Sequence, residues 1–240
     1  MANRFVEKLC RFVQLSPEEM AALEEATARP RPFGPHRDLI REGDRPGPVL
    51  VMLEGWALRY KVLPGGGRQI VAFLMPGDAC DLHVNLLAEM DHSIQTITNA
   101  QVATIPGEIM EKMMAQPGIA RAMYISQLVD EGTLRAWIVS MGRRSSVERI
   151  AHLLLELYRR AADVGLAAGD TMALPLSQAV LADAVGMTSV HVNRMLQELR
   201  RSGAVTLQRG VLNICNPAAL TRLAGFDENY LHRSRRSVFS

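Results

Sequence analysis

Between residues 33 and 107 the sequence consists of short apolar runs separated by Gly and Pro, and few folds accommodate that pattern. The runs are VLVML (49–53), ALRYKVL (57–63), QIVAFLM (69–75) and QTITNAQVATI (95–105). Gly and Pro interrupt strands because glycine adopts turn conformations and proline lacks the backbone N–H that a strand needs. Short strands at this spacing predict a β-sandwich or barrel, with a hairpin tip at 64–67. Residues 82–90 interrupt the strands with a short helical pattern.

A long helix is predicted over 118–141, where small and apolar residues recur at heptad spacing. These residues are Ala122, Ile125, Val129, Gly132, Ala136 and Val139. Such a seam allows two helices to approach closely, so it predicts a homodimer; a helix buried entirely within one subunit is the alternative. A second apolar set, including Trp137 and Ile138, is expected to pack on the β-domain. Gly142-Arg143-Arg144 interrupts the pattern and is interpreted as a hinge.

The segment 175–214 predicts a helix-turn-helix followed by a wing. Ser177 can cap a helix over 178–185, and Thr188 can cap a second helix over 189–201, with Gly186 in the turn between them. Six apolar residues are expected to be internal: Ala182, Val185, Val192, Met195, Leu196 and Leu199. Residues 203–214 predict two short strands with Arg209 at their tip, where it can approach a DNA phosphate.

The exposed early part of the second helix is expected to carry the residues that contact DNA. They are Ser189, Val190, His191, Asn193 and Arg194. This part of a helix-turn-helix enters the major groove. Arg194 can pair with a guanine through two hydrogen bonds, and Asn193 or His191 can contact a base edge or a phosphate. Plain helical packing, with Arg194 in a surface ion pair, is the alternative.

Over nearly its full length the chain resembles the Crp/Fnr regulators. The matching landmarks are Gly43-Asp44 in REGD, Gly55 in LEGWALRY, Pro76-Gly77-Asp78, ERIAHLLLEL and LADAVGMTSVHVNRMLQELRRSG. The resemblance implies an α+β chain: an N-terminal double-stranded β-helix or jelly roll (the β-roll) as a sensor domain at 1–117, a long dimerisation helix and hinge at 118–144, and a winged helix-turn-helix at 145–240. It also implies a homodimer that binds two-fold-related DNA and contacts RNA polymerase. Family members usually carry Arg or Glu where this chain has Ser189 and Val190, so a different base sequence is expected.

The cyclic-AMP site of the family is poorly matched. Where cyclic-AMP-binding members carry Gly-Glu and Arg-Ser, this chain has Asp81-Leu82 and His92-Ser93, and Leu134-Arg135 stands in place of the Thr-Ser pair that reads the purine. A carboxylate without a fixed guanidinium makes a poor phosphate site, so cyclic AMP is not expected to be the signal. These residues, with His83, are candidates for the pocket of another effector. Further candidate lining residues are Leu74, Leu86, Leu87 and Ile138.

The three cysteines limit which signals other than cyclic AMP the protein could sense. Cys10, Cys80 and Cys215 are too few and too scattered for an iron-sulfur cluster, which needs four thiolates. Carbon-monoxide-sensing members use a His and a Cys near Cys80 and His83, so these two residues are candidate haem ligands. The alternative is that Cys80 packs as an apolar side chain. Redox sensing by Cys80 has no support from neighbouring residues, which leaves an unidentified small molecule or no ligand.

Composition limits the class of protein. The chain is 48% hydrophobic and 22% charged, with a net charge of +2. No apolar run is long enough to span a bilayer and the N-terminal residues do not form a secretory signal, so a cytoplasmic protein with no membrane contact is expected. The nearest approach to a catalytic grouping is Asp81, His83 and His92, and no enzyme is predicted. The rival interpretation is an interaction module that does not bind DNA.

Overall fold

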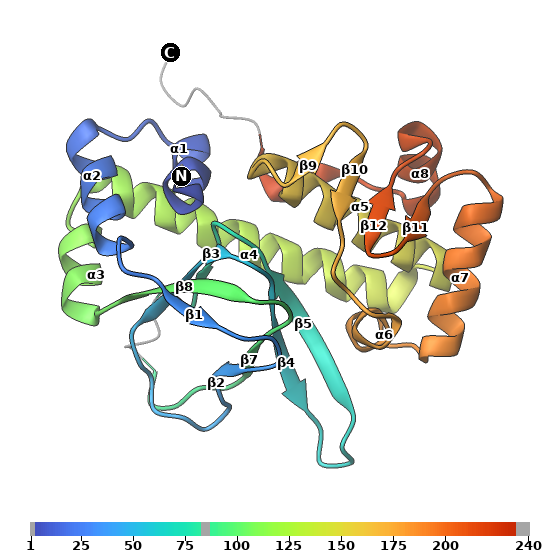
Figure 1. The fold of residues 1–240 in the computed structure, drawn as a ribbon, viewed down its shortest axis with the longest axis horizontal. Coiled ribbons are helices and arrows are strands. Elements are labelled where there is room, and N and C mark those ends of the chain that lie inside the picture. Colours follow the sequence, from blue (N-terminus) through green and yellow to red (C-terminus); the bar gives the residue numbers. More distant parts are fainter. Residues whose placement is uncertain (1–2, 83–86, 234–240) are drawn as a thin grey trace. The chain divides into compact units, whose positions relative to one another are not determined.

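The computed structural model describes residues 3–82 and 87–233, which divide into two compact units (Figure 1). Of the described residues, the first unit comprises 3–61, 72–82, 87–131 and 232–233, and the second unit comprises 62–71 and 132–231. No helix in the described ranges is both long and apolar enough to cross a membrane.

The N-terminal strands form two four-stranded sheets. One sheet has the order β1-β8-β3-β6 and the other has the order β2-β7-β4-β5. The strands are β1 (Arg31–Phe33), β2 (Asp38–Ile40), β3 (Val49–Glu54), β4 (Ala57–Val62), β5 (Arg68–Leu74), β6 (Ala79–Cys80), β7 (Ser93–Thr96) and β8 (Ala100–Ile105). The outer part of the β4–β5 hairpin groups with the second unit. The β-sandwich predicted from the Gly and Pro pattern is therefore confirmed, as is the hairpin after β4.

One predicted apolar run contains a turn. The run at 95–105 divides into the end of β7 and all of β8, because the chain turns at 97–99. The carbonyl oxygen of Trp56 accepts the backbone N–H of Ile97 at 2.7 Å, which holds this turn against the β3–β4 connection. Gly55 lies in that connection with φ +82°, and a Cβ there would lie 2.2 Å from the carbonyl oxygen of Asn99. Only glycine fits such a close approach of two backbone segments.

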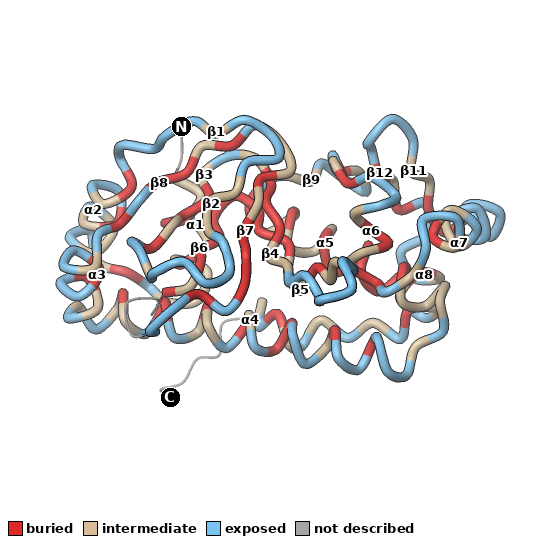
Figure 2. The backbone as a smooth tube through the Cα atoms, turned by 90° about the horizontal axis from the view of Figure 1, so that it is seen from below, coloured by how far each residue is buried: buried red, intermediate tan, exposed pale blue. Residues whose placement is uncertain are grey.

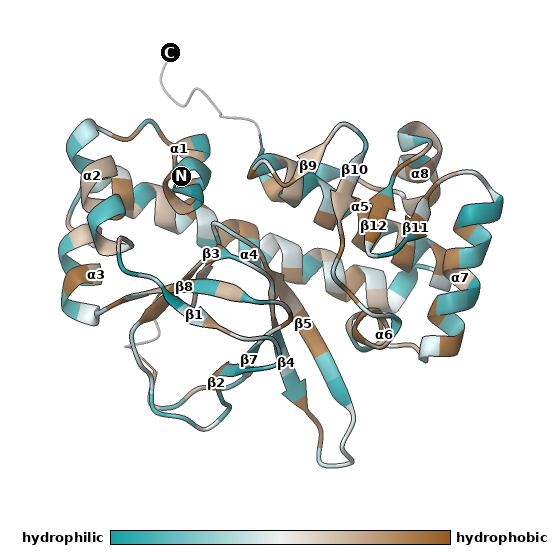
Figure 3. Ribbon diagram, in the orientation of Figure 1, coloured by the Kyte–Doolittle hydropathy of each residue, from teal (hydrophilic) through white to brown (hydrophobic). Residues whose placement is uncertain are grey.

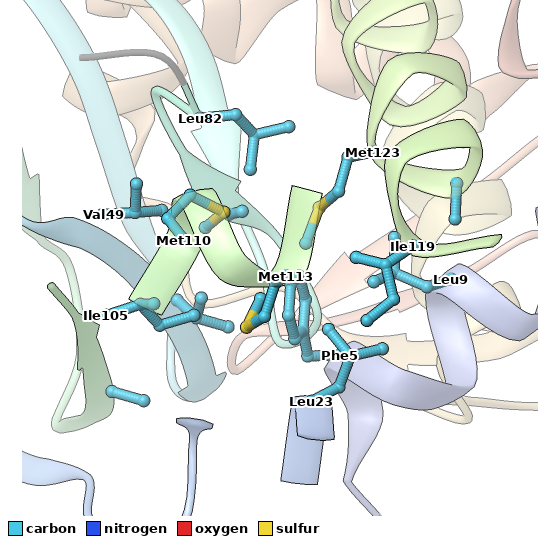
Figure 4. Packing of buried hydrophobic residues seen from close by; sticks show 14 of the residues in the cluster. Phe5, Leu9, Leu23, Val49, Leu82, Ile105, Met110, Met113, Ile119 and Met123 are labelled. Atoms are coloured by element: carbon cyan, nitrogen blue, oxygen red, sulfur yellow. The ribbon is translucent and has the colours of Figure 1, made fainter. Parts of the chain in front are cut away.

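Helices and strands share one apolar core in the first unit (Figure 4). The helices are α1 (Arg4–Phe12), α2 (Pro17–Ala26), α3 (Gly107–Met114) and the first turns of α4. Their core side chains include Phe5, Leu23, Met110, Met113, Ile119 and Met123, which pack with Val49 and Ile105 of β3 and β8. Burial of these side chains is the main term that stabilises the unit, at about 1.5–3 kcal/mol for each large apolar side chain.

The long helix α4 spans Pro117–Arg143 and is 27 residues long. The helix predicted over 118–141 is confirmed, and it ends at Arg143, inside the predicted Gly142-Arg143-Arg144 interruption; the role of this segment as a hinge stays a prediction. A glycine near a helix end costs only about 1 kcal/mol relative to alanine, so it does not by itself end a helix. Figure 2 shows buried and exposed residues alternating along α4.

The second unit consists of helices and one small sheet. Its helices are α5 (Ser146–Asp163), α6 (Gln178–Val185), α7 (Ser189–Arg201) and α8 (Pro217–Ala224), followed by the 3₁₀ turn η2 (Glu228–Leu231). Its strands are β9 (Ala167–Ala168), β10 (Thr171–Ala173), β11 (Thr206–Gln208) and β12 (Val211–Asn213), in the order β11-β12-β10-β9. Strands β9 and β10 were not predicted from the sequence. The predicted α+β architecture as a whole is confirmed.

Candidate nucleic-acid interface

Helices α6 and α7 form a helix-turn-helix with the predicted bounds. The Ser177 hydroxyl accepts the N–H of Val180 at 3.2 Å, and the Thr188 hydroxyl accepts the N–H of His191 at 3.2 Å, so each hydroxyl caps its helix. Between the helices, Gly186 has φ 65° and ends α6 in the left-handed conformation that favours glycine. The turn is short because Gly186 ends α6 and Thr188 caps the start of α7 only two residues later.

The inner face of the motif is apolar, as predicted. Ala182, Val185, Val192 and Leu199 are buried, whereas Met195 and Leu196 are half-buried. Figure 3 shows both apolar and polar residues along α7. A helix with one apolar face is held against its unit by that face and presents the other to solvent.

The early part of α7 presents the predicted contact residues outward. Ser189, Val190 and Arg194 are exposed, whereas His191 and Asn193 are half-buried. The Arg194 guanidinium donates from Nη2 to His191 Nδ1 at 2.9 Å, so the cation is oriented by its own helix one turn before it. This arrangement offers a fixed guanidinium fork, a branched apolar side chain and a hydroxyl on one exposed helix end.

The predicted wing is a two-stranded hairpin with Arg209 at its tip. β11 and β12 pair in antiparallel fashion, with Gln208 opposite Val211. Arg209 and Gly210 fill the two-residue turn with φ 51° and φ 75°. Positive φ at both positions is typical of a type I′ hairpin turn, and it leaves the Arg209 side chain exposed.

The motif is attached to the end of α4 by Arg149, which sequence reasoning did not single out. Its guanidinium donates to the carbonyl oxygens of Val185 (2.8 Å), Met141 (3.0 Å) and Arg144 (3.3 Å). These carbonyls lie at or just after the C-terminal ends of α6 and α4, where the helix dipole favours a cation. A Cβ on Gly186 would also lie 2.6 Å from Cε of Met141, so the turn of the motif packs closely on the end of α4.

A buried carboxylate joins α5 to α4 and to the 3₁₀ turn η2. Glu156 of α5 is fully buried and accepts from Nε1 of Trp137 at 3.1 Å and from the hydroxyl of Tyr230 at 2.8 Å. Burial raises the pKa of Glu156, against the opposing charge of Arg160. In the sequence, Arg149 and Glu156 stand out only as charged residues within an apolar helical pattern. That pattern does not show which residues they contact.

Two of the predicted effector residues in the first unit, Asp81 and His92, bond to each other, and the other bonds of this group go to residues that were not predicted. The Asp81 carboxylate accepts from Nη2 of Arg59 at 2.9 Å and lies 3.0 Å from Nε2 of His92. Burial acts to raise the pKa of Asp81, but the hydrogen bond with His92 and the charge of Arg59 outweigh it and lower that pKa. The buried Ser93 hydroxyl accepts the backbone N–H of Glu42 at 3.0 Å. The structure therefore places a guanidinium, that of Arg59, beside Asp81, which was not expected from the sequence; the Asp81 carboxylate itself would still repel a phosphate at this position.

The remaining effector candidates fall in different settings. Leu82 and Cys80 are buried, and burial raises the pKa of the Cys80 thiol. Leu134 and Arg135 are exposed. His83 and Leu86 lie outside the described residues. Within the described ranges, no group of three His, Cys, Asp or Glu side chains is arranged to hold a metal ion.

The predicted dimer seam is partly covered by the chain itself. Ala122 belongs to the apolar core of the first unit, and a Cβ on Gly132 would lie 3.0 Å from the carbonyl oxygen of Tyr230. Val129 is also buried, Ile125 and Ala136 are half-buried, and only Val139 is clearly exposed. Three of the six seam residues are thus buried within one chain, which favours the alternative of intrachain packing for that part of the helix, and the dimer seam itself stays a prediction.

Two segments of the chain match known domains. Residues 148–223 match the Crp-like helix-turn-helix domain, and residues 30–117 match the cyclic nucleotide-binding domain. With the geometry of α6, α7 and the wing, these matches define a DNA-binding transcription regulator rather than an enzyme. The chain belongs to the Crp/Fnr family of regulators, in which dimers are typical.

Relatives of known name agree with this assignment. The chain is 34% identical over 177 residues to the nitrogen fixation regulation protein FixK of Bradyrhizobium diazoefficiens, covering 72% of each chain. It is 27% identical over 195 residues to the transcriptional activator protein FnrL of Cereibacter sphaeroides, covering 80% of this chain and 77% of that protein. The solved structure of FixK2 from Bradyrhizobium japonicum superposes with a TM-score of 0.74 at 25% identity, over 83% of this chain and 98% of that one.

Proposed function

We propose that the protein is a homodimeric transcription factor that binds two-fold-related DNA through α7. The observation that carries this proposal is the exposed start of α7, where Arg194 is oriented by His191 at 2.9 Å. A guanidinium held in this way can donate two hydrogen bonds to O6 and N7 of a guanine in the major groove. Two copies related by a two-fold axis would place two such helices about 34 Å apart, one turn of DNA.

The other residues of the motif are assigned by their chemistry. Asn193 or His191 would contact a base edge or a phosphate, since both side chains carry hydrogen-bonding groups near the helix start. Ser177, Thr188 and Ser189 lie at helix N-termini, where hydroxyls and backbone N–H groups favour phosphate. Arg209 would reach a phosphate from the tip of the wing.

The dimer face is proposed on the exposed stripe of α4. Tyr124, Leu128 and Ile138 are 56%, 50% and 72% exposed, and their spacing places them on one side of the helix. A stripe of large apolar side chains on a long helix favours a partner helix, because solvent exposure of such a surface is costly. This stripe differs from the seam predicted from the sequence; of that seam, Val139 is exposed and lies on the same side of the helix as the stripe.

The signal is proposed to be something other than cyclic AMP. The Asp81 carboxylate already pairs with Arg59 and His92, so a phosphate at this position would meet a negative charge and would compete with it for both partners. Cys80 is buried among apolar side chains, which favours its role as a packed apolar residue over that of a haem ligand. An unidentified small molecule is therefore the candidate signal that remains. Contact between the DNA-bound dimer and RNA polymerase is proposed from the family alone.

Selection from a random DNA library tests this function. The purified full chain should enrich a sequence made of two inverted half-sites, with centres about 10 base pairs apart. Arg194→Ala should lose this enrichment, whereas Arg222→Ala, at an exposed position of α8, should retain it. Enrichment of no sequence, or of a site that lacks two-fold symmetry, would contradict the proposal.

A further inference from the structure

Val190 is an apolar side chain placed where polar contacts would be expected. It is the second residue of α7 and is 72% exposed. Its neighbour two residues on, Val192, is fully buried and supplies the apolar contact with the unit. Val190 therefore adds little to the stability of the fold, and its place on α7 calls for another explanation.

Val190 lies on the same side of α7 as Arg194. Residues four apart on a helix are neighbours on its surface, about 5–6 Å apart at Cβ. Adjacent base pairs of DNA are about 3.4 Å apart. When Arg194 contacts the edge of a base, Val190 therefore faces a base pair that is at most about two base pairs away from that base.

The chemistry of valine limits what it can contact. It has no hydrogen-bond donor or acceptor, so it cannot pair with the polar edge of a base. The apolar group that the major groove offers is the C5-methyl group of thymine. A methyl group packed on a methyl group is removed from water on both sides, which favours the complex.

We infer that Val190 is a specificity-determining residue that packs on the C5-methyl group of a thymine, within about two base pairs of the base that Arg194 reads. The inference rests on the proposed function, because it requires α7 to enter the major groove. 5-Methylcytosine presents the same methyl group at the same position. The side chain therefore recognises the methyl group rather than a pattern of hydrogen bonds.

Deoxyuridine substitution tests this directly, since it removes only the methyl group from a thymine. The site enriched by the wild-type chain is synthesised with each thymine replaced in turn, and dissociation constants are measured by fluorescence anisotropy. Replacing one particular thymine by deoxyuridine in a single half-site should weaken binding about fourfold. Replacing the equivalent thymine in both half-sites should weaken binding roughly 15-fold. Val190→Ala should bind the parent site more weakly and lose this sensitivity to deoxyuridine.

Two controls separate recognition from general damage. Val211→Ala removes a valine that is 47% exposed on β12 of the wing, and it should keep the full deoxyuridine effect. Replacing the identified thymine by cytosine should weaken wild-type binding, and 5-methylcytosine should recover about fourfold of that loss only when Val190 is present.

The outcomes are distinguishable. If every thymine of an enriched site tolerates deoxyuridine, or if the penalty persists in Val190→Ala, the inference is overturned while the proposed function stands. If the wild-type chain enriches no sequence at all, the proposed function fails and the inference fails with it.

Discussion

The guanidinium of Arg149 donates from Nη1 to the carbonyl oxygen of Val185 at 2.8 Å, which ties the start of α5 to the end of α6. The same group donates from Nη2 to Met141 at 3.0 Å, so one side chain holds the C-terminal ends of two helices. A planar fork with several donors suits this task, since it can satisfy carbonyls in different directions without moving.

Replacing Arg149 by lysine should weaken this attachment. An ammonium group is a compact charge and cannot reach both carbonyls in the geometry of the fork, so we expect a loss of about 1.5–3 kcal/mol in the free energy of unfolding. Urea unfolding of Arg149→Lys measures it, with Arg222→Lys at an exposed position of α8 as the matched control. Equal unfolding midpoints for Arg149→Lys and the wild type would show that the contact stabilises nothing.

Protonation of His152 should destabilise the second unit as the pH falls below neutrality. His152 is 2% exposed and packs against Phe226 and Tyr230, and burial lowers its pKa from 6.5 to about 4. The unfolded chain therefore binds a proton between these two pH values that the folded chain does not. The resulting loss between pH 6.5 and 4 is at most about 3 kcal/mol, from about 1.4 kcal/mol per pKa unit.

His152→Phe should reduce this pH dependence, because phenylalanine fills a similar space and cannot take up the proton. Chemical unfolding at several pH values between 4 and 7.5 measures the effect. His36→Asn, at an exposed turn, is the control and should leave the pH dependence as in the wild type. An unchanged slope in His152→Phe would rule out this histidine as its source.

Charges placed on the exposed stripe of α4 should separate the dimer. Leu128→Arg and Ile138→Arg each put a cation where an apolar contact is proposed, and a buried unpaired charge costs several kcal/mol. Light scattering coupled to size exclusion should show a dimer for the wild type and a monomer for both variants. Val62→Arg, at a side chain that is 51% exposed on β4, should remain a dimer. A wild-type monomer at micromolar concentration would refute the proposed face.

Cyclic AMP should leave thermal stability unchanged. A ligand at 100 times its dissociation constant stabilises a protein by about 2.7 kcal/mol, which shifts the melting temperature by several degrees. Because Asp81 is already bonded to Arg59 and His92, we expect no shift at millimolar cyclic AMP. A concentration-dependent rise in melting temperature would contradict the assignment of this site.

The helix-turn-helix was predictable because nearby residues determine where its helices begin and end. Ser177, Gly186 and Thr188 act on residues within one turn of themselves, so their identity and spacing alone marked α6 and α7. The wing was likewise marked by Arg209-Gly210 between two short apolar runs.

The attachments of that motif were not predictable, because they join residues that are distant in sequence. Arg149 meets Val185 only after α5, α6 and the sheet between them have packed. The side of α4 that faces outward also depends on distant residues: Gly132 lies against Tyr230, which follows it by almost a hundred positions. Heptad spacing identifies a packed face, but it does not say which chain covers that face.

The central claim, that α7 reads a specific DNA sequence through Arg194, is tested most directly by comparing two affinities at one salt concentration. Anisotropy titration should show that the wild type binds its enriched site at least about a thousandfold more tightly than a scrambled duplex. Arg194→Ala should lose about 1–3 kcal/mol at each half-site, which is about 2–6 kcal/mol for the symmetric dimer, while its binding to the scrambled duplex changes little. Equal affinity of the wild type for both duplexes would contradict the claim.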